Sequence, residues 1–276
     1  MDRMKFKGAI FDLDGVITNT ASIHAKSWKK MFDEFLKDYY STNNKKFVPF
    51  DIDHDYLKYV DGKPRYKGVQ SFLESRGIKL SFGSPKDLGH KKTICGLGNK
   101  KNKMYLKLIK KEKIHVYNST ISLVKKLKEA KIKVAVISSS KNCKLILRMA
   151  GFGKFFHTVI DGKTSERAGL SGKPNPDIFV YAAKKLGLHP GECAIFEDAL
   201  SGEEAGINGN FGLIVGISRT KVKMAEGDIE VDDLKELRLS DIRKWFEKGI
   251  QAESWKLKYH KFDKEGEKLR ETLTTV

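Results

Sequence analysis

From about residue 118 onward, short apolar segments alternate with amphipathic segments, and this alternation restricts the fold more than any other feature. We predict strands over 5–11, 133–138, 157–160, 194–197 and 212–217, and helices over 118–130, 141–150, 176–186 and 201–208. Strands that alternate with helices favour a parallel sheet covered by helices on both faces. A ligand of such a sheet binds at the carboxyl ends of the strands.

The segment between the first strand and this alternating region has a different pattern. His24 to Leu36 has its apolar residues at helical spacing, and 51–76 and 104–110 also read as helical, with no convincing strand among them. We therefore predict an α/β protein with a Rossmann-like core. The predicted boundaries are 1–17 and 113–238 for the core, 18–112 for an inserted α-helical cap, and 239–276 for a helical tail.

Four polar clusters follow predicted strands or open a helix. They are Asp12 with Asp14, the run from Ser138 to Asn142, Lys173 with Pro174, and Glu197 with Asp198. Each cluster alone has an ordinary interpretation, such as a turn, a loop, a helix start or a helix cap. Their conjunction, in this order and at one edge of a parallel sheet, favours a shared site.

Phosphoryl transfer requires such a combination of groups, because positioning and electrostatics do most of the work. Asp12 and Asp14 are two residues apart and point to the same side if the strand continues, so one can attack phosphorus while the other moves a proton. Glu197 and Asp198 offer the hard oxygen ligands that suit Mg²⁺.

The phosphate itself needs donors and a positive charge. Ser138 can donate a hydrogen bond to a phosphate oxygen, and Lys173 can neutralise phosphate charge. The residue types therefore support a magnesium-dependent phosphoryl-transfer site.

Four segments, FDLDGV, the serine after the second predicted strand, GKPNPDIF and FEDALSG, resemble the four motifs of the haloacid dehalogenase superfamily. The resemblance extends from residue 5 to about residue 235. It implies that Asp12 forms an aspartyl-phosphate, that Asp14 is the general acid/base, and that Ser138 and Lys173 hold the phosphate. It also implies the metal ligands, which are the Asp12 and Asp198 carboxylates and the Asp14 backbone carbonyl, with Glu197 beside them.

The helical insertion resembles the small cap of the β-phosphoglucomutase branch of that superfamily. The opening DLDGVITNT, the element Gly62-Lys63-Pro64-Arg65 and the run SSSKN carry this resemblance, although Asn19 stands where the branch usually has an Asp. It implies that Arg65 binds the phosphate that is not being transferred. The implied substrate-binding residues are Thr20, His24, Trp28, Gly62, Arg65, Lys101, Ser140, Lys141 and Asn142.

Three functions stay open at this point. The leading expectation is a mutase that interconverts β-D-glucose 1-phosphate and glucose 6-phosphate through the 1,6-bisphosphate. The alternatives are a sugar-phosphate phosphatase on the same scaffold and a non-catalytic basic binding module. A mutase has a physical need for Arg65, because it must grip a phosphate at each end of the sugar and exclude water from the phospho-aspartate.

The composition bears on partners and location. The net charge of +18 comes mostly from lysines spread along the chain, so we expect an enzyme for an anionic substrate and no nucleic-acid partner. No apolar run approaches the length of a membrane span, and three scattered cysteines fit reduced thiols in a cytoplasm. We expect a monomer.

The C-terminal tail gives a separate expectation. Residues 255–276 resemble the start of glycoside hydrolase family 65 proteins, which include disaccharide phosphorylases that release β-glucose 1-phosphate. This resemblance implies a functional link to such a phosphorylase.

Overall fold

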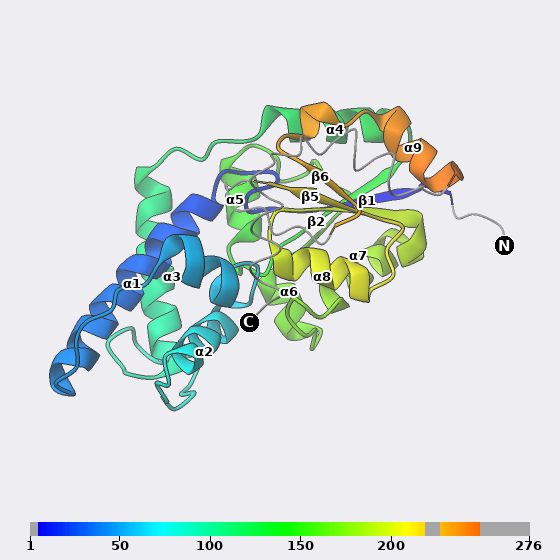
Figure 1. Ribbon diagram of the computed structural model, residues 1–276. Helices are drawn as coiled ribbons and strands as arrows, with labels where there is room; N and C mark the ends of the chain where they lie inside the picture. The colour runs from blue at the N-terminus through cyan, green and yellow to red at the C-terminus, as the bar shows by residue number, and fades with distance from the viewer. Residues whose placement is uncertain (1–4, 219–226, 249–276) are drawn as a thin grey trace, which may run out of the picture.

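The computed structural model describes residues 5–218 and 227–248, and a six-stranded sheet lies at its centre (Figure 1). The strands are β1 Gly8–Asp12, β2 Lys133–Ile137, β3 Thr158–Ile160, β4 Cys193–Glu197, β5 Leu213–Ile217 and β6 Ile229–Val231. Every pairing is parallel and the order is β3-β2-β1-β4-β5-β6, so β1 is central. The five predicted strands are confirmed, and β6 is an addition that the sequence did not predict.

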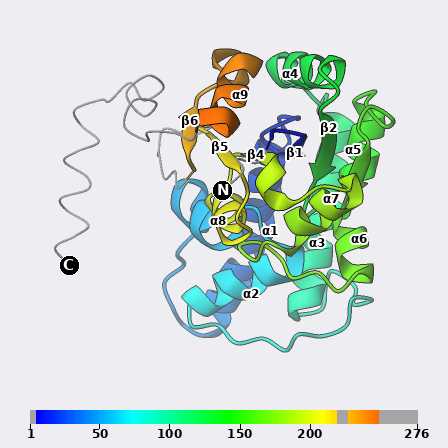
Figure 2. The same cartoon turned by 90° about the vertical axis from the view of Figure 1, so that its right-hand side faces the viewer.

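Both faces of the sheet are covered. Ala9 and Phe11 of β1 join the apolar cluster on one face, and Ile10 joins the cluster on the other. Helices α4 (Asn118–Glu129) and α9 (Leu239–Lys248) cover the first face, whereas α7 (Asp177–Leu186) and α8 (Leu200–Asn208) cover the second (Figures 1 and 2). Burial on both sides explains why these strands are almost entirely apolar.

The remaining helices of the sheet region are short. They are α5 (Cys143–Met149), α6 (Gly162–Arg167) and the 3₁₀ turns η2 (Pro190–Glu192) and η3 (Leu234–Glu236). The sequence did not predict α6. Gly187 ends α7 with a φ of +69°, a conformation that glycine adopts without strain.

The predicted start of the helix over 118–130 is confirmed. Asn118 is already the first residue of α4, and the capping position belongs to Tyr117, whose side chain makes no capping hydrogen bond. Thr120, in the first turn of this helix, donates to the carbonyl of Val16 at 2.7 Å. Its hydroxyl therefore ties the helix to the chain that follows β1.

The predicted helical insertion contains four helices, and no strand lies within residues 21–111. They are α1 (Ala21–Thr42), the π-helix η1 (Ile52–Val60), α2 (Arg65–Ser75) and α3 (Ile94–Lys111). α3 begins ten residues before the predicted helix at 104–110, and the Thr93 side chain caps it by accepting from the Gly96 N–H at 2.9 Å. These four helices pack around an aromatic cluster of their own and lie beyond one end of the sheet (Figure 1).

The exact division into core, cap and tail stays an interpretation of the sequence. Ile242 and Phe246 of α9, within the predicted tail, are buried in the same cluster as the strands, so this part of the tail packs on the core. The rest of the tail, 249–276, lies outside the described residues. No helix in 5–218 or 227–248 has the length and apolar character needed to cross a membrane.

Replacing Phe32 by Ala is expected to lower the free energy of unfolding by about 3–5 kcal/mol. The ring is fully buried and its centroid lies 5.4, 5.0 and 4.2 Å from those of Trp28, Phe50 and Phe72. Urea unfolding measures the loss, and Val48→Ala, at a side chain 45% exposed, is the control. A loss of under about 1 kcal/mol for Phe32→Ala would contradict a packed helical cluster.

Candidate active site

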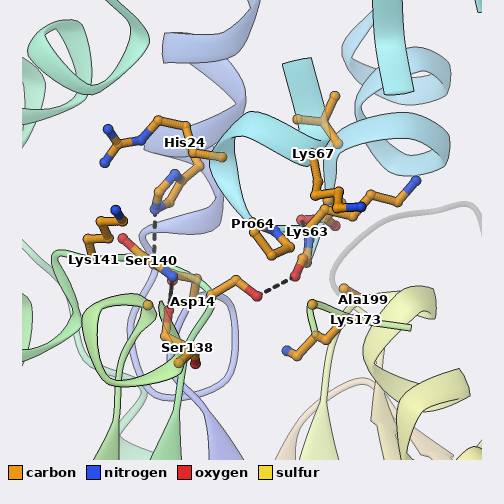
Figure 3. A pocket seen from close by; sticks show the side chains of 18 of the residues that line it. Asp14, His24, Lys63, Pro64, Lys67, Ser138, Ser140, Lys141, Lys173 and Ala199 are labelled. Carbon is orange, nitrogen blue, oxygen red and sulfur yellow. Dashed lines mark hydrogen bonds and ion pairs between the residues drawn. The ribbon is translucent and has the colours of Figure 1, made fainter. Parts of the chain in front are cut away.

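A cavity of about 300 Å³ lies between the carboxyl ends of the strands and the helical insertion (Figure 3). All four polar clusters of the sequence contribute to the wall of this cavity from the sheet side. The predicted site residues that line it are Asp12, Asp14, His24, Trp28, Gly62, Arg65, Lys101, Ser138, Ser140, Lys141, Asn142, Lys173, Glu197 and Asp198. The structure thus brings together residues up to 186 positions apart, from Asp12 to Asp198.

Thr20 is the one predicted substrate-binding residue that is missing from the described lining. It is fully buried, and its hydroxyl donates to Asp14 Oδ1. This place supports a role in orienting the Asp14 carboxylate and does not support contact with a substrate.

A buried lysine connects two of the carboxylates. Lys173 Nζ lies 2.7 Å from Asp12 Oδ1 and also donates to Glu197 Oε1. Burial by itself lowers the pKa of Lys173, but these two carboxylates outweigh it and shift the pKa upward. The ammonium is therefore a fixed positive charge beside Asp12.

Asp12, Glu197 and Asp198 form a compact acidic cluster in which one oxygen of each lies within 4.8 Å of the others. Burial raises the pKa of Asp12 and of Asp198 well above the ordinary aspartate value, so both need positive charge nearby to stay ionised. Lys173 supplies one charge for three carboxylates. A cluster of hard carboxylate oxygens whose negative charge exceeds the positive charge beside it fits a divalent cation.

Two glycines make room for this cluster. A Cβ on Gly15, whose φ is +86°, would lie 1.6 Å from Asp198 Oδ2, and one on Gly202 would lie 1.7 Å from Glu197 Oε1. The motifs FDLDGV and FEDALSG therefore need glycine at these positions so that the carboxylates can approach.

Asp14 is held by three side chains. Its carboxylate accepts a hydrogen bond from the Thr20 hydroxyl and another, at 3.0 Å, from Ser138 Oγ. Asp14 Oδ1 also lies 3.4 Å from His24 Nε2. Burial raises its pKa, but His24 and the two hydroxyls outweigh that effect and lower the pKa to about 2. Its own backbone N–H donates to Asp12 Oδ2 at 2.8 Å, which couples the two carboxylates in space.

His24 links Asp14 to the helical insertion. Lys101 Nζ lies 2.5 Å from His24 Nδ1 and 4.7 Å from the centre of the Trp28 ring. Burial lowers the pKa of Lys101 well below its ordinary value. In the protonated form of Lys101 the ammonium can only donate to His24 Nδ1, and the ring proton is then on Nε2, facing Asp14 (Figure 3). Burial and the Lys101 charge both lower the pKa of His24, which agrees with a neutral ring.

Arg65 is fixed over the cavity by asparagines of α3. Its guanidinium donates to Asn99 Oδ1 at 3.2 Å and to Asn102 Oδ1 at 2.9 Å. Asn142, from the sheet region, donates to the same Asn102 oxygen at 2.9 Å. The arginine is thus held by neutral amides, and its guanidinium carbon lies 5.8 Å from the centre of the Tyr66 ring.

Sequence reasoning missed Asp61, Tyr56 and Ser201 at this site, and it included Ser139 only as part of the run from Ser138 to Asn142. Asp61 and Tyr56 line the cavity and are hydrogen-bonded to each other, and burial raises the pKa of Asp61 to about 6. Ser139 and Ser201, from the sheet region, donate to backbone carbonyls of the 61–62 loop. The adjacent Gly62 and Arg65 were a usable signal for Asp61, whereas an acidic residue in a helical segment ordinarily indicates a solvated face.

A carboxylate beside a buried lysine and an acidic cation site, all at the strand ends of a parallel sheet, define an enzyme of phosphoryl transfer. The chain belongs to the haloacid dehalogenase-like hydrolase family, whose model matches residues 6–210. This membership confirms the predicted superfamily and agrees with the general use of a divalent metal in it.

Known proteins place the chain within that family. It is 44% identical over 240 residues to a β-phosphoglucomutase of Mycobacterium bovis, an overlap of 84% of this chain and 92% of that protein. It is 32% identical over 230 residues to an uncharacterized glycosyl hydrolase of Mycobacterium tuberculosis, an overlap of 83% of this chain but only 16% of that protein. The crystal structure of β-phosphoglucomutase from Clostridium difficile superposes with a TM-score of 0.68 at 26% identity, covering 88% of this chain and 97% of that one.

Proposed function

We propose that this enzyme is a β-phosphoglucomutase, which interconverts β-D-glucose 1-phosphate and glucose 6-phosphate through β-glucose 1,6-bisphosphate. The observation that carries the proposal is that one cavity holds two separate cationic groups, each of which we propose to bind a phosphate. Lys173, beside Asp12, is one, and Arg65, held by Asn99 and Asn102, is the other. The 44% identity to a protein named β-phosphoglucomutase supports the same activity.

In the proposed reaction, an Asp12 carboxylate oxygen attacks a phosphorus of the bisphosphate, the bond from that phosphorus to the sugar oxygen breaks, and the departing oxygen takes a proton from Asp14, which leaves an aspartyl-phosphate and a sugar monophosphate. A sugar hydroxyl then attacks that phosphorus, the bond to Asp12 breaks, and the hydroxyl proton passes to Asp14. Ser138 and Lys173 hold the oxygens of the transferring group. His24, with its Nε2 proton facing Asp14, keeps that carboxylate oriented for the proton transfer.

The bisphosphate has to bind in two orientations, because each of its phosphates must reach Asp12 in turn. Arg65 provides a guanidinium for whichever phosphate is not reacting. Lys101, Lys141 and Asn142 line the same cavity and are proposed to contact the substrate between the two phosphates. Trp28 supports this arrangement by packing under the Lys101 ammonium.

We propose Mg²⁺ as the divalent ion. The Asp12 and Asp198 carboxylates would hold it, together with the Asp14 backbone carbonyl and with Glu197 beside them. A bound Mg²⁺ supplies positive charge to the transferring phosphate. All of these ligands are hard oxygens, which is the donor set that Mg²⁺ prefers.

Removing divalent ions with a chelator is expected to abolish isomerase activity and to lower the melting temperature, because the charge balance of the buried carboxylates is lost. Adding back Mg²⁺ should restore both. Calorimetry on Asp198→Asn provides a readout that does not depend on activity, since this variant should lose the stabilisation by Mg²⁺. Full activity in the presence of a chelator would contradict the proposed metal site.

A panel of hexose phosphates tests the assignment of substrate. We expect turnover of β-D-glucose 1-phosphate, in the presence of trace bisphosphate and Mg²⁺, to exceed that of the α-anomer and of other hexose 1-phosphates. Both the isomerised sugar and inorganic phosphate are measured for each compound. If phosphate release outpaces isomerisation for every member, the enzyme is a sugar-phosphate phosphatase and the mutase assignment fails.

We also propose that a disaccharide phosphorylase of family 65 supplies the substrate and that the enzyme acts as a monomer. The resemblance of 255–276 supports the link, as does the similarity to a mycobacterial protein named as a glycosyl hydrolase. Those residues lie outside the described ones. Sedimentation analysis tests the monomer, and coupled phosphorolysis of disaccharides tests the link.

A further inference from the structure

A second cavity, of about 290 Å³, lies next to the active-site cavity. The two cavities share four wall residues, which are Tyr56, Asp61, Asp198 and Ala199. Exposed residues of the second cavity, among them Asn19, Ser22 and Asp53, connect it with the protein surface. Water can therefore reach the back of this shared wall.

The shared wall is formed where the loop at residues 61–62 meets the sheet region. Gly62, with a φ of +69°, lies so close to the core that a Cβ would be 2.3 Å from Ser201 Oγ and 3.2 Å from the Ala199 Cβ. The Asp61 side chain accepts from the Gly62 N–H at 3.0 Å and is hydrogen-bonded to the buried Tyr56. Tyr56, only 7% exposed, fills the space behind the loop.

Two core serines hold the loop down, one on each side. Ser201 Oγ donates to the Asp61 carbonyl at 3.0 Å, and Ser139 Oγ donates to the Gly62 carbonyl at 2.7 Å. Ser139 lines the active-site cavity, whereas Ser201 is absent from the described lining of both cavities. Ser201 thus acts on the loop and has no place from which to touch a substrate.

We infer that Ser201 is a positioning residue which, by fastening the 61–62 loop to the core, seals the active-site cavity from the second cavity and limits hydrolysis of the phosphorylated Asp12. The inference rests on the proposed function and deepens it, because it concerns which acceptor receives the phosphoryl group. Water and the sugar hydroxyl compete for the same phosphorus. The seal favours the sugar.

The competing step is a simple displacement. A water oxygen bonds to phosphorus, the bond from phosphorus to the Asp12 oxygen breaks, and the carboxylate is regenerated. One water proton passes to Asp14 and the other stays on the departing inorganic phosphate. The step needs only water, so its rate depends on access to the phospho-aspartate.

The test compares Ser201→Ala with Ser22→Ala, a matched change at an exposed serine on the outer wall of the second cavity. With β-glucose 1-phosphate, trace bisphosphate and Mg²⁺, the ratio of inorganic phosphate to glucose 6-phosphate should rise about fivefold in Ser201→Ala, the effect of losing one hydrogen bond of about 1 kcal/mol. The ratio should not change in Ser22→Ala. A serine that matters only for stability would lower the melting temperature and leave this ratio alone.

A second variant and a second readout keep the outcomes separate. Tyr56→Phe removes the hydroxyl bonded to Asp61 and keeps the ring, so it should also raise the ratio. If the ratio in both variants matches that of the unaltered enzyme, the seal is refuted. If the unaltered enzyme forms no glucose 6-phosphate, the proposed function fails instead. The seal is then tested by phosphorylating the enzyme with acetyl phosphate and measuring the lifetime of the phosphoenzyme in buffer. A shorter lifetime in Ser201→Ala than in the unaltered enzyme would support the seal, and an equal lifetime would refute it.

Discussion

Asp12→Asn is expected to lower isomerase turnover by about 10⁴-fold or more, because an amide cannot attack phosphorus and form the aspartyl-phosphate. The side chains have nearly the same shape, so the cavity and the fold should be retained. Intact-protein mass spectrometry after exposure to bisphosphate should show a phosphorylated species for the unaltered enzyme and none for the variant.

Asp53→Asn is the matched control, since Asp53 is exposed and lies outside the active-site cavity. It should keep its activity and its phosphorylation. If Asp12→Asn retained more than a small fraction of turnover, covalent transfer through Asp12 would be excluded, and with it the relay between the two ends of the sugar.

Arg65→Ala is expected to lower isomerisation by about 10²–10³-fold, since it removes a forked, charge-assisted contact to the distal phosphate. The neutral amides of Asn99 and Asn102 hold the guanidinium in place but cannot replace its charge. Transfer from a donor with one phosphate, such as acetyl phosphate, should stay within about threefold, because only the second phosphate depends on Arg65.

Arg65→Lys separates charge from geometry. It should recover part of the isomerisation, because a lysine restores the charge without the planar fork. Arg148→Ala, at an exposed arginine of α5, serves as the control and should leave both reactions unchanged. Equal losses in isomerisation and in transfer from acetyl phosphate would show that Arg65 supports the fold and does not bind the distal phosphate.

The sheet and the core motifs were predictable because their signals are local. Most predicted strands are short apolar runs that are buried on both faces, and polar residues follow them where the parallel sheet ends. The convergence of Asp12, Ser138 and Asp198 follows from that topology, whereas Lys173 reaches the site from the segment between α6 and α7. The short β6 and α6 were missed because three to six residues give too little periodicity to be read.

Contacts between the helical insertion and the core could not be predicted in the same way. The bond from Ser201 to the Asp61 carbonyl joins residues 140 positions apart, and a serine early in a helix is ordinarily interpreted as a cap. Thr20 was predicted to bind substrate, whereas the structure buries it behind Asp14. Both depend on how two packed units meet, which neither periodicity nor composition encodes.

Passage of phosphate by Asp12 between two ends of one sugar is tested most directly by ³¹P NMR of the enzyme with β-glucose 1-phosphate, Mg²⁺ and trace bisphosphate. We expect the glucose 1-phosphate signal to be replaced by that of glucose 6-phosphate, with inorganic phosphate remaining a minor product. Conversion of the same substrate to inorganic phosphate, with no glucose 6-phosphate signal at any time, would contradict it.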